Sequence, residues 1–205
     1  MLANRIAHPL KADFERLDRG FFQRPTLTVA RDLLGKTIVR RYRGRRISGV
    51  ILETEAYKGP EDRASHGYGG RRTPAVEALY NEPGSLHIYF VYGMHWLLNF
   101  KSGKPGKPEG ILIRSVLTQS GREAKIINGP GRVTRHFKID KSLRGEDSMR
   151  SERLWVEERG VVVPARHITR GPRIGIDYAG DYWISRPWRF TVNLKNLSCP
   201  QRTSR

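Results

Sequence analysis

Two glutamates and a tyrosine stand at alternate positions in the apolar segment VILETEAY, residues 50–57. If this segment is a strand, successive side chains alternate in direction, so Glu53, Glu55 and Tyr57 share one face. Two residues of strand rise place the two carboxylates about 7 Å apart. One carboxylate held near a water molecule can act as a general base at neutral pH. The spacing does not choose between the two acids, and a solvated strand face paired with arginines is the alternative interpretation.

An aromatic-rich stretch has the pattern of a β-hairpin with an apolar tip. Residues 86–92 (LHIYFVY) and 95–100 (HWLLNF) are rich in aromatic and branched side chains, with a very short turn between them. Tyr92 and Met94 then lie at the tip, as do side chains that wedge between base pairs. A tip that packs back on the core is the alternative. Strand alternation predicts that Tyr89 and Tyr92 point to opposite faces.

The chain is strongly basic. Lys and Arg number 38 against 20 Asp and Glu, which gives a formal net charge of +18 and a sequence pI of about 10.7. Five arginines lie within residues 40–46, and Lys101, Lys104 and Lys107 punctuate one Gly/Pro-rich loop. Such runs usually coat a solvated face, but the whole-chain charge favours a polyanion, and we expect nucleic acid. The charge predicts a class of partner and no chemistry.

Several other chemistries lack their sequence signature. The only cysteine, Cys199, excludes an internal disulfide framework and zinc sites built on two or more thiolates, and indicates a reducing compartment. The six histidines form no i,i+4 pair on an expected helix, and there is no P-loop, GxSxG or GxGxxG motif. We therefore expect neither a metal nor a cofactor.

No segment has the pattern of a membrane anchor or a targeting sequence. The most apolar stretch, residues 87–100, is only 14 residues long and is interrupted by polar side chains. It is too short to span a bilayer. The start of the chain has no unbroken apolar region and carries acidic residues, unlike a signal peptide.

The elements that must position these residues suggest one domain, residues 1–205, of the α+β class with a mostly antiparallel sheet. Strands and helices do not alternate regularly, which argues against a doubly wound parallel fold. The expected strands are 37–41, 47–57, 86–92, 95–100, 111–117, 154–157, 173–176 and 188–194. The expected helices are a short one capped by Thr26 or Thr28 and stopped by Gly35, one from Thr73 to Tyr80, and helical turns at 120–127 and 131–138.

The runs ETEAYKGPEDRASH (residues 53–66) and YFVYGMHWLLNF (89–100) resemble the alkyladenine (3-methyladenine, or N-methylpurine) DNA glycosylase family. The similarity continues through ARDLLGK, ILIRSV, NGPGRVTRHFKI, PRIGIDYAG and RPWRF, and covers residues 20–195 in order. The resemblance gives no prediction for the first twenty and the last ten residues. The family implies a curved, open-barrel or roll-like sheet with short peripheral helices and a protruding β-hairpin.

The resemblance implies a role for each matched residue. Glu55 is then the general base that activates water, Glu53 supports it, and Arg114 with a backbone carbonyl near Ile174 helps to hold that water. Tyr57, His66 and Tyr89 then stack on an extruded base, and Asn99 excludes the amino group of guanine. Tyr92 fills the gap that is left in the duplex, and Met94 lies beside it at the intercalating tip. From its place on the strand alone, Asn99 is more often a structural hydrogen-bonding residue.

The implied activity is that of a monofunctional DNA glycosylase in base excision repair. It flips alkylated or deaminated purines, such as 3-methyladenine or hypoxanthine, out of duplex DNA and hydrolyses the N-glycosidic bond, which leaves an abasic site. We expect a monomer that binds damaged double-stranded DNA without a cofactor or membrane. It would be cytoplasmic and nucleoid-associated in a prokaryote, and nuclear in a eukaryote. The alternative is a basic nucleic-acid-binding protein without catalytic activity.

Overall fold

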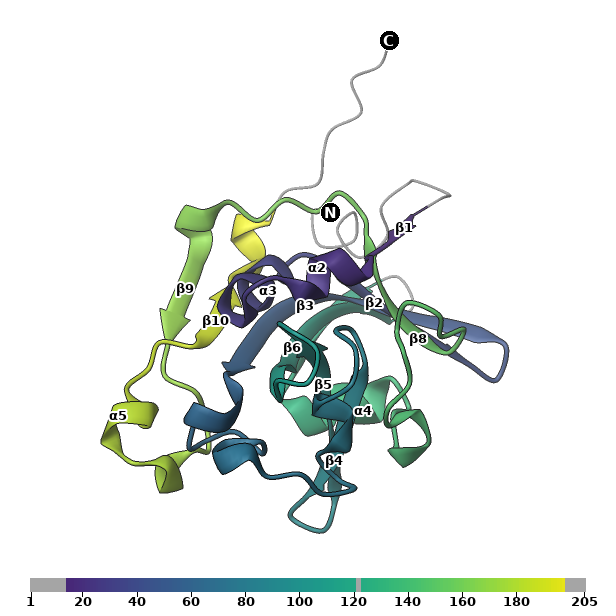
Figure 1. Cartoon of the computed structure of the whole chain (residues 1–205). Helices are drawn as coiled ribbons and strands as arrows, with labels where there is room; N and C mark the ends of the chain where they lie inside the picture. Colours follow the sequence, from purple (N-terminus) through teal and green to yellow (C-terminus); the bar gives the residue numbers. More distant parts are fainter. Residues whose placement is uncertain (1–13, 121–122, 198–205) are drawn as a thin grey trace.

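The computed structural model describes residues 14–120 and 123–197, and their strands form one curled antiparallel sheet (Figure 1). The strand order is β1-β8-β2-β3-β6-β5-β4, with β7 paired to β6, β10 paired to β3, and β9 paired to β10. The strands are β1 (Glu15–Arg16), β2 (Thr37–Tyr42), β3 (Arg45–Tyr57), β4 (Leu86–Val91), β5 (His95–Ser102), β6 (Glu109–Ser120), β7 (Glu123–Asn128), β8 (Leu154–Glu158), β9 (Ile168–Gly171) and β10 (Arg189–Val192). The predicted α+β class with a curved antiparallel sheet is confirmed.

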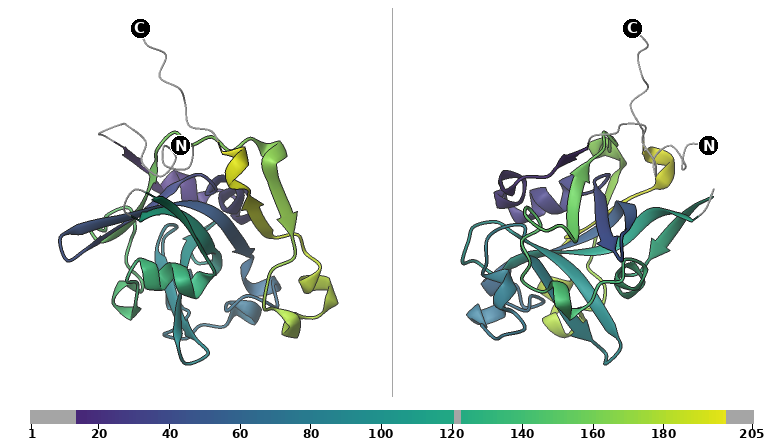
Figure 2. Two further views of the ribbon diagram at one scale, coloured as in Figure 1. Left: turned by 180° about the vertical axis from the view of Figure 1, so that it is seen from behind. Right: turned by 90° about the vertical axis from the view of Figure 1, so that its right-hand side faces the viewer.

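The helices of the described residues are short and lie around the sheet (Figures 1 and 2). The α-helices are α2 (Arg19–Gln23), α3 (Thr26–Asp32), α4 (Pro130–His136) and α5 (Asp181–Ile184). The 3₁₀ turns are η1 (Gly59–Glu61), η2 (Tyr68–Gly70), η3 (Glu77–Leu79), η4 (Lys141–Leu143), η5 (Ala165–His167), η6 (Asp177–Ala179) and η7 (Leu194–Asn196). Among the described residues no helix is long and apolar enough to cross a membrane.

The central strands β3 and β6 are buried on both faces, which fixes what each side chain of β3 meets. Thr54 points toward α3, where its hydroxyl donates a hydrogen bond to the carbonyl of Ala30 at 2.7 Å. Val29 and Ala30 of α3 are fully buried in the apolar core that covers this side of the sheet. Because side chains alternate along a strand, Glu53 and Glu55 face the opposite side.

A double irregularity in the β3–β6 pairing re-aims one side chain. Ile51 pairs with Val116, Glu53 with Ser115 and Thr54 with Ile113, so that the register shifts and then shifts back. Arg114 is left without a pairing partner on β3. Bulges of this kind bend a strand and redirect a side chain, and here the guanidinium of Arg114 lies against the acids of β3.

Four of the sequence-based assignments are wrong in detail. The helical turn expected at 120–127 is wrong: residues 121–122 lie outside the described residues, and 123–127 belong to β7, because Ile126 and Ile127 are β-branched and the ladder with β6 satisfies the backbone. The segment 73–80 contains only a turn and η3 rather than an α-helix. Residues 173–176 are a loop, and the strand before them is β9. Finally, α3 is preceded by Pro25, and no threonine caps it through a side chain.

The other expected elements are present. The helix α3 is followed by Gly35 with φ of +85°, as its stop signal predicts. Strands β4 and β5 form the predicted hairpin, which protrudes from the body at the lower edge of Figure 1. Both views of Figure 2 show the same hairpin projecting downwards. Its turn consists of residues 92–94, and Tyr92 and Gly93 have φ of +52° and +65°.

Candidate active site

A cavity of about 420 Å³ opens on the face of the sheet that carries the two glutamates, and strands β4, β5 and β6 build one side of it. His87 pairs with Asn99, Asn99 with Leu112, and Leu112 with Glu55, so these four side chains form a row across adjacent strands. Residues paired directly across a sheet lie on the same face. The other side is formed by residues 64–66 and by the loop that carries Ile174 and Tyr178.

Glu55 is fully buried and lies directly behind three residues that line the cavity. Its carboxylate accepts three hydrogen bonds from groups that line the cavity. The hydroxyl of Tyr57 donates to Oε2 at 2.9 Å, the guanidinium of Arg114 contacts the same oxygen at 3.3 Å, and the backbone N–H of Ile174 donates to Oε1 at 2.8 Å. The backbone N–H of Ile174 was not predicted to contact Glu55; the carbonyl expected near Ile174 was assigned to the water and stays a prediction.

Burial and the three hydrogen-bond donors have opposite effects on the pKa of Glu55. Burial raises the pKa of the Glu55 carboxyl above its ordinary value, and the nearby charge of Glu53 adds to the increase. The charge of Arg114, the Ile174 N–H and the Tyr57 hydroxyl oppose it but do not cancel it. The result is a buried carboxylate more basic than an exposed glutamate, as general-base catalysis near neutral pH requires.

Glu53 has a different environment from Glu55. Its Oε1 accepts from Arg114 Nε at 3.3 Å and from Arg189 of β10 at 3.2 Å. Two arginines therefore neutralise Glu53, whereas Glu55 shares only one. The pairing of acids with arginines, proposed as the alternative to a site, describes Glu53 well and Glu55 only in part. The structure distinguishes the two acids, which spacing alone could not.

A buried ion pair that we did not predict positions the loop carrying Ile174. Arg173 and Asp62 are both buried and make a two-pronged contact at 2.5 and 2.9 Å, and Arg173 also donates to the carbonyl of Ala56 at 3.0 Å. The guanidinium lies over the ring of Tyr57, 4.7 Å from its centroid. Both charged residues lie within the matched motifs. Their residue types were therefore visible in the sequence, but nothing in the sequence indicated that they form an ion pair with each other.

The predicted aromatic walls come together. The rings of His66 and Tyr89 meet edge to face with centroids 4.1 Å apart, and Tyr57 also lines the cavity. Burial raises the pKa of the Tyr57 hydroxyl well above its ordinary value, so Tyr57 is a neutral hydrogen-bond donor. Electron-rich rings in such an arrangement can hold a flat, cationic group by stacking and cation–π attraction.

Asn99 is buried in the same cavity. Its side-chain amide donates to the carbonyl of His87, its partner across the hairpin, at 3.3 Å. The structural hydrogen-bonding role considered for Asn99 is therefore real, and the same side chain also lines the site. No group of three or more His, Cys, Asp or Glu side chains that could hold a metal ion occurs in the described part of the chain.

Comparison with known proteins agrees with this geometry. The family model described as methylpurine-DNA glycosylase matches residues 20–196. The chain belongs to this family. It is therefore a monofunctional DNA glycosylase, a DNA-repair hydrolase of N-glycosyl bonds, and its substrate is DNA.

Curated members of the methylpurine-DNA glycosylase family are similar over most of their length. A protein from Desulfitobacterium hafniense (strain Y51) is 41% identical over 198 residues, which cover 86% of this chain and 94% of the relative. One from Clostridium perfringens (strain SM101 / Type A) is 38% identical and covers 86% and 95%, and one from Bacillus cereus (strain AH187) is 38% identical and covers 83% and 92%. Each carries the name "Putative 3-methyladenine DNA glycosylase".

In this glycosylase, the hairpin tip stands beside the cavity. Tyr92 is 83% exposed and also lines the cavity, whereas Met94 is 67% exposed and is not among the lining residues. The expectation that Tyr89 and Tyr92 face opposite ways is wrong, because Tyr92 belongs to the turn, where strand alternation does not apply. The alternative of a tip packed on the core is also wrong.

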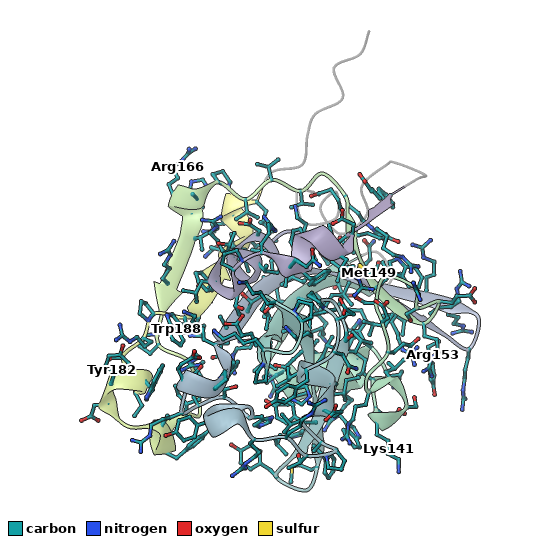
Figure 3. All side chains as sticks on the ribbon, in the orientation of Figure 1. Lys141, Met149, Arg153, Arg166, Tyr182 and Trp188 are labelled. Carbon is teal, nitrogen blue, oxygen red and sulfur yellow. The ribbon has the colours of Figure 1, made fainter. Side chains whose placement is uncertain are left out.

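A corner of the glycosylase next to the site is rich in aromatic residues that we did not predict to be there. Tyr182 of α5 and Trp188 mark this corner in Figure 3. Trp183 contacts both rings, with centroids 4.9 and 5.9 Å away, and packs on a small apolar cluster of Ala64, Ile176 and Ala179. This cluster supports the loop that lines the cavity.

Proposed function

We propose that this glycosylase excises 3-methyladenine and other alkylated or deaminated purines, such as hypoxanthine, from duplex DNA through a water molecule activated by Glu55. The observation that carries the proposal is a fully buried carboxylate, with a raised pKa, that is hydrogen-bonded to three residues lining an aromatic cavity. The printed names of the relatives support 3-methyladenine as one substrate. The wider range of lesions is our own extension.

Base flipping delivers the nucleotide in this scheme. The glycosidic bond is shielded inside a duplex, so the enzyme extrudes the damaged base and inserts it between Tyr57, His66 and Tyr89. Alkylation at a ring nitrogen makes the purine cationic, which strengthens its attraction to these rings and improves it as a leaving group. Tyr92 fills the vacated position in the base stack. Alkylated bases are therefore both bound and released in preference to normal ones.

The chemical step uses the carboxylate in two ways. As the bond from C1′ to the base nitrogen breaks, positive charge develops on the sugar, and the anionic Glu55 stabilises it. Water attacks C1′ and its proton passes to Glu55, while the base leaves with the electron pair of the broken bond. Arg114 and the Ile174 N–H hold the carboxylate in place. Among the described residues that line the cavity there is no lysine, so water is the nucleophile and the product is an abasic site.

Asn99 supplies selectivity against guanine. It is buried in the wall of the cavity and tied to the His87 carbonyl, so it cannot swing aside freely. A purine with an exocyclic amino group on the edge that faces Asn99 would have to displace this bond. Normal guanine is excluded by this clash, whereas purines without that amino group enter.

One copy of the chain supplies every residue of this scheme. We therefore propose that the enzyme acts as a monomer and as a single glycosylase domain, residues 1–205, without a cofactor. It would work in the nucleoid of a prokaryote or the nucleus of a eukaryote.

Replacement of the base tests the proposal. The assay incubates the protein with a duplex that holds one 3-methylated or deaminated purine, in EDTA, and cleaves abasic sites with alkali. Glu55→Gln should bind the lesion but lose about hundredfold or more in single-turnover rate, because the amide cannot accept a proton. The matched variant Glu53→Gln should lose much less. Inactive Glu53→Gln with active Glu55→Gln would reassign the base, and a loss in EDTA would indicate a metal.

A further inference from the structure

A second histidine lines the cavity beside His66 and has no role in the scheme above. His87 of β4 is 2% exposed, and its Nε2 lies 3.4 Å from Nδ1 of His66. Its ring stacks on Tyr89 with centroids 5.3 Å apart. The other nitrogen, Nδ1, is buried and has no hydrogen-bond partner among the described residues. This buried and unpartnered atom restricts how the two rings can share hydrogens.

Both imidazoles are neutral at neutral pH. Burial lowers the pKa of His87 to about 3, and its electrostatic interactions with His66 and Arg144 act in the same direction. Burial and the nearby Arg71 lower the pKa of His66 as well. A neutral imidazole carries one hydrogen, so one nitrogen of each ring is a donor and the other an acceptor.

Two arrangements satisfy the contact between the rings. If His66 Nδ1–H donates, His87 must carry its own hydrogen on Nδ1, where no acceptor is present. If His87 Nε2–H donates, its Nδ1 keeps only a lone pair, and the hydrogen of His66 is on Nε2. A buried N–H without an acceptor is rarer than an under-used acceptor, because the donor loses its full hydration. The second arrangement is therefore favoured.

We infer that His87 is a positioning residue that holds His66 as the Nε2–H tautomer, so that the cavity wall presents a neutral N–H donor to the extruded nucleotide. The ligand part of this inference rests on the proposed function. Nδ1 of His66 faces the buried His87, so Nε2 lies at the far edge of a ring that lines the cavity. A donor there matches a nucleotide with an acceptor atom on that side. The opposite tautomer would offer a lone pair and favour an amino group.

The tautomer can be measured on the free enzyme. A long-range ¹H–¹⁵N correlation spectrum of protein labelled with ¹⁵N-histidine distinguishes protonated from bare ring nitrogens, and the variants His66→Gln and His87→Gln assign the two rings. We expect Nε2–H on both rings. A hydrogen on Nδ1 of His66, or rapid exchange between its two forms, overturns the inference. This result does not depend on excision, so it separates the tautomer from the proposed function.

Variants at His87 test the consequence for the substrate. His87→Gln keeps an N–H donor for His66 and should excise at close to the normal rate. His87→Phe keeps a ring but removes the donor, and should lower lesion affinity or single-turnover rate about two- to tenfold, the worth of one hydrogen bond. His136→Phe is the matched control, since His136 contacts Thr118 and does not line the cavity. Equal rates in the Phe and Gln variants, with unchanged melting, contradict a positioning role.

Discussion

Residue by residue, the site is an arrangement in which one carboxylate is kept reactive while its neighbour is neutralised. Glu53 has two arginine partners, and Glu55 shares one of them. Burial destabilises the charged form of Glu55 more than its three hydrogen-bond donors stabilise it, because the pKa of the carboxyl remains raised. Such a group takes up a proton as the pH falls sooner than an ordinary glutamate does.

The raised pKa of Glu55 predicts the acid side of the pH profile. The base must be deprotonated, so the excision rate should rise with pH through an apparent pKa above the ordinary glutamate value of 4.5. Arg114 is the strongest of the influences that lower this pKa. Arg114→Met should therefore slow excision and move the acid limb to higher pH. Single-turnover rates between pH 4 and 9 measure both effects.

A matched variant separates this effect from a general loss of charge. Arg135 on α4 is exposed and lies outside the cavity. Arg135→Met should leave the acid limb where it is. An acid limb that stays in place in Arg114→Met would show that a group other than Glu55 controls the rate.

The chemistry-bearing residues could be predicted from the sequence because each has a recognisable type within a specific motif. Four of them, Tyr57, His66, Tyr89 and Asn99, line one cavity, and Glu55 lies behind Tyr57. Their supports could not be predicted. The contact between Arg173 and Asp62 joins residues 111 positions apart, and the backbone N–H on Glu55 has no side chain to reveal it. Burial and long-range pairing decide such contacts.

At the scale of elements, the strands were easier to predict than the short helices. Strands such as 47–57 and 111–117 carry apolar and β-branched runs that fit a buried sheet. Helix formation by itself contributes little to so short a segment, so tertiary contacts decide the structure, against a helix at 123–127 and 73–80 and for one in the equally short α3 and α4. A short segment next to a strand pairs with it, as β7 does with β6. The bulge that aims Arg114 has no marker in the sequence.

The β4–β5 hairpin should control flipping rather than bond cleavage. Tyr92 is held at its tip, exposed and next to the cavity. Extrusion of a base costs a few kcal/mol, of which a wedge recovers part. If Tyr92 recovers about 1.4 kcal/mol, Tyr92→Ala should excise about tenfold more slowly from paired DNA. The loss should shrink when the lesion is mispaired.

A fluorescent base analogue beside the lesion reports extrusion separately from cleavage. Tyr92→Ala should show less extrusion, and Tyr92→Phe, which keeps the ring, should resemble the native enzyme. Normal extrusion with slow cleavage would place Tyr92 in the chemical step instead.

Considered as a whole molecule, the glycosylase has exposed arginines both next to the cavity and far from it along the chain. Arg71 follows the loop of His66 and is close enough to affect its pKa. Arg45 begins β3 at the turn of the β2–β3 hairpin, which projects to the right in Figure 1 while the β4–β5 tip projects downwards. Both arginines are exposed. They allow the DNA-binding face to be located by charge removal.

Salt dependence measures how many phosphates are neutralised, and where. Each phosphate contact contributes a slope of about −0.9 in log K against log salt concentration. Binding of lesion duplex should weaken steeply with salt, as expected for a chain of net charge +18. Arg71→Ser should reduce the magnitude of the slope by about 0.9, the loss of one contact, and Arg45→Ser should leave it unchanged. Equal reductions in both variants would mean that DNA contacts both sides of the molecule, and a slope near zero in the native enzyme would contradict electrostatic binding altogether.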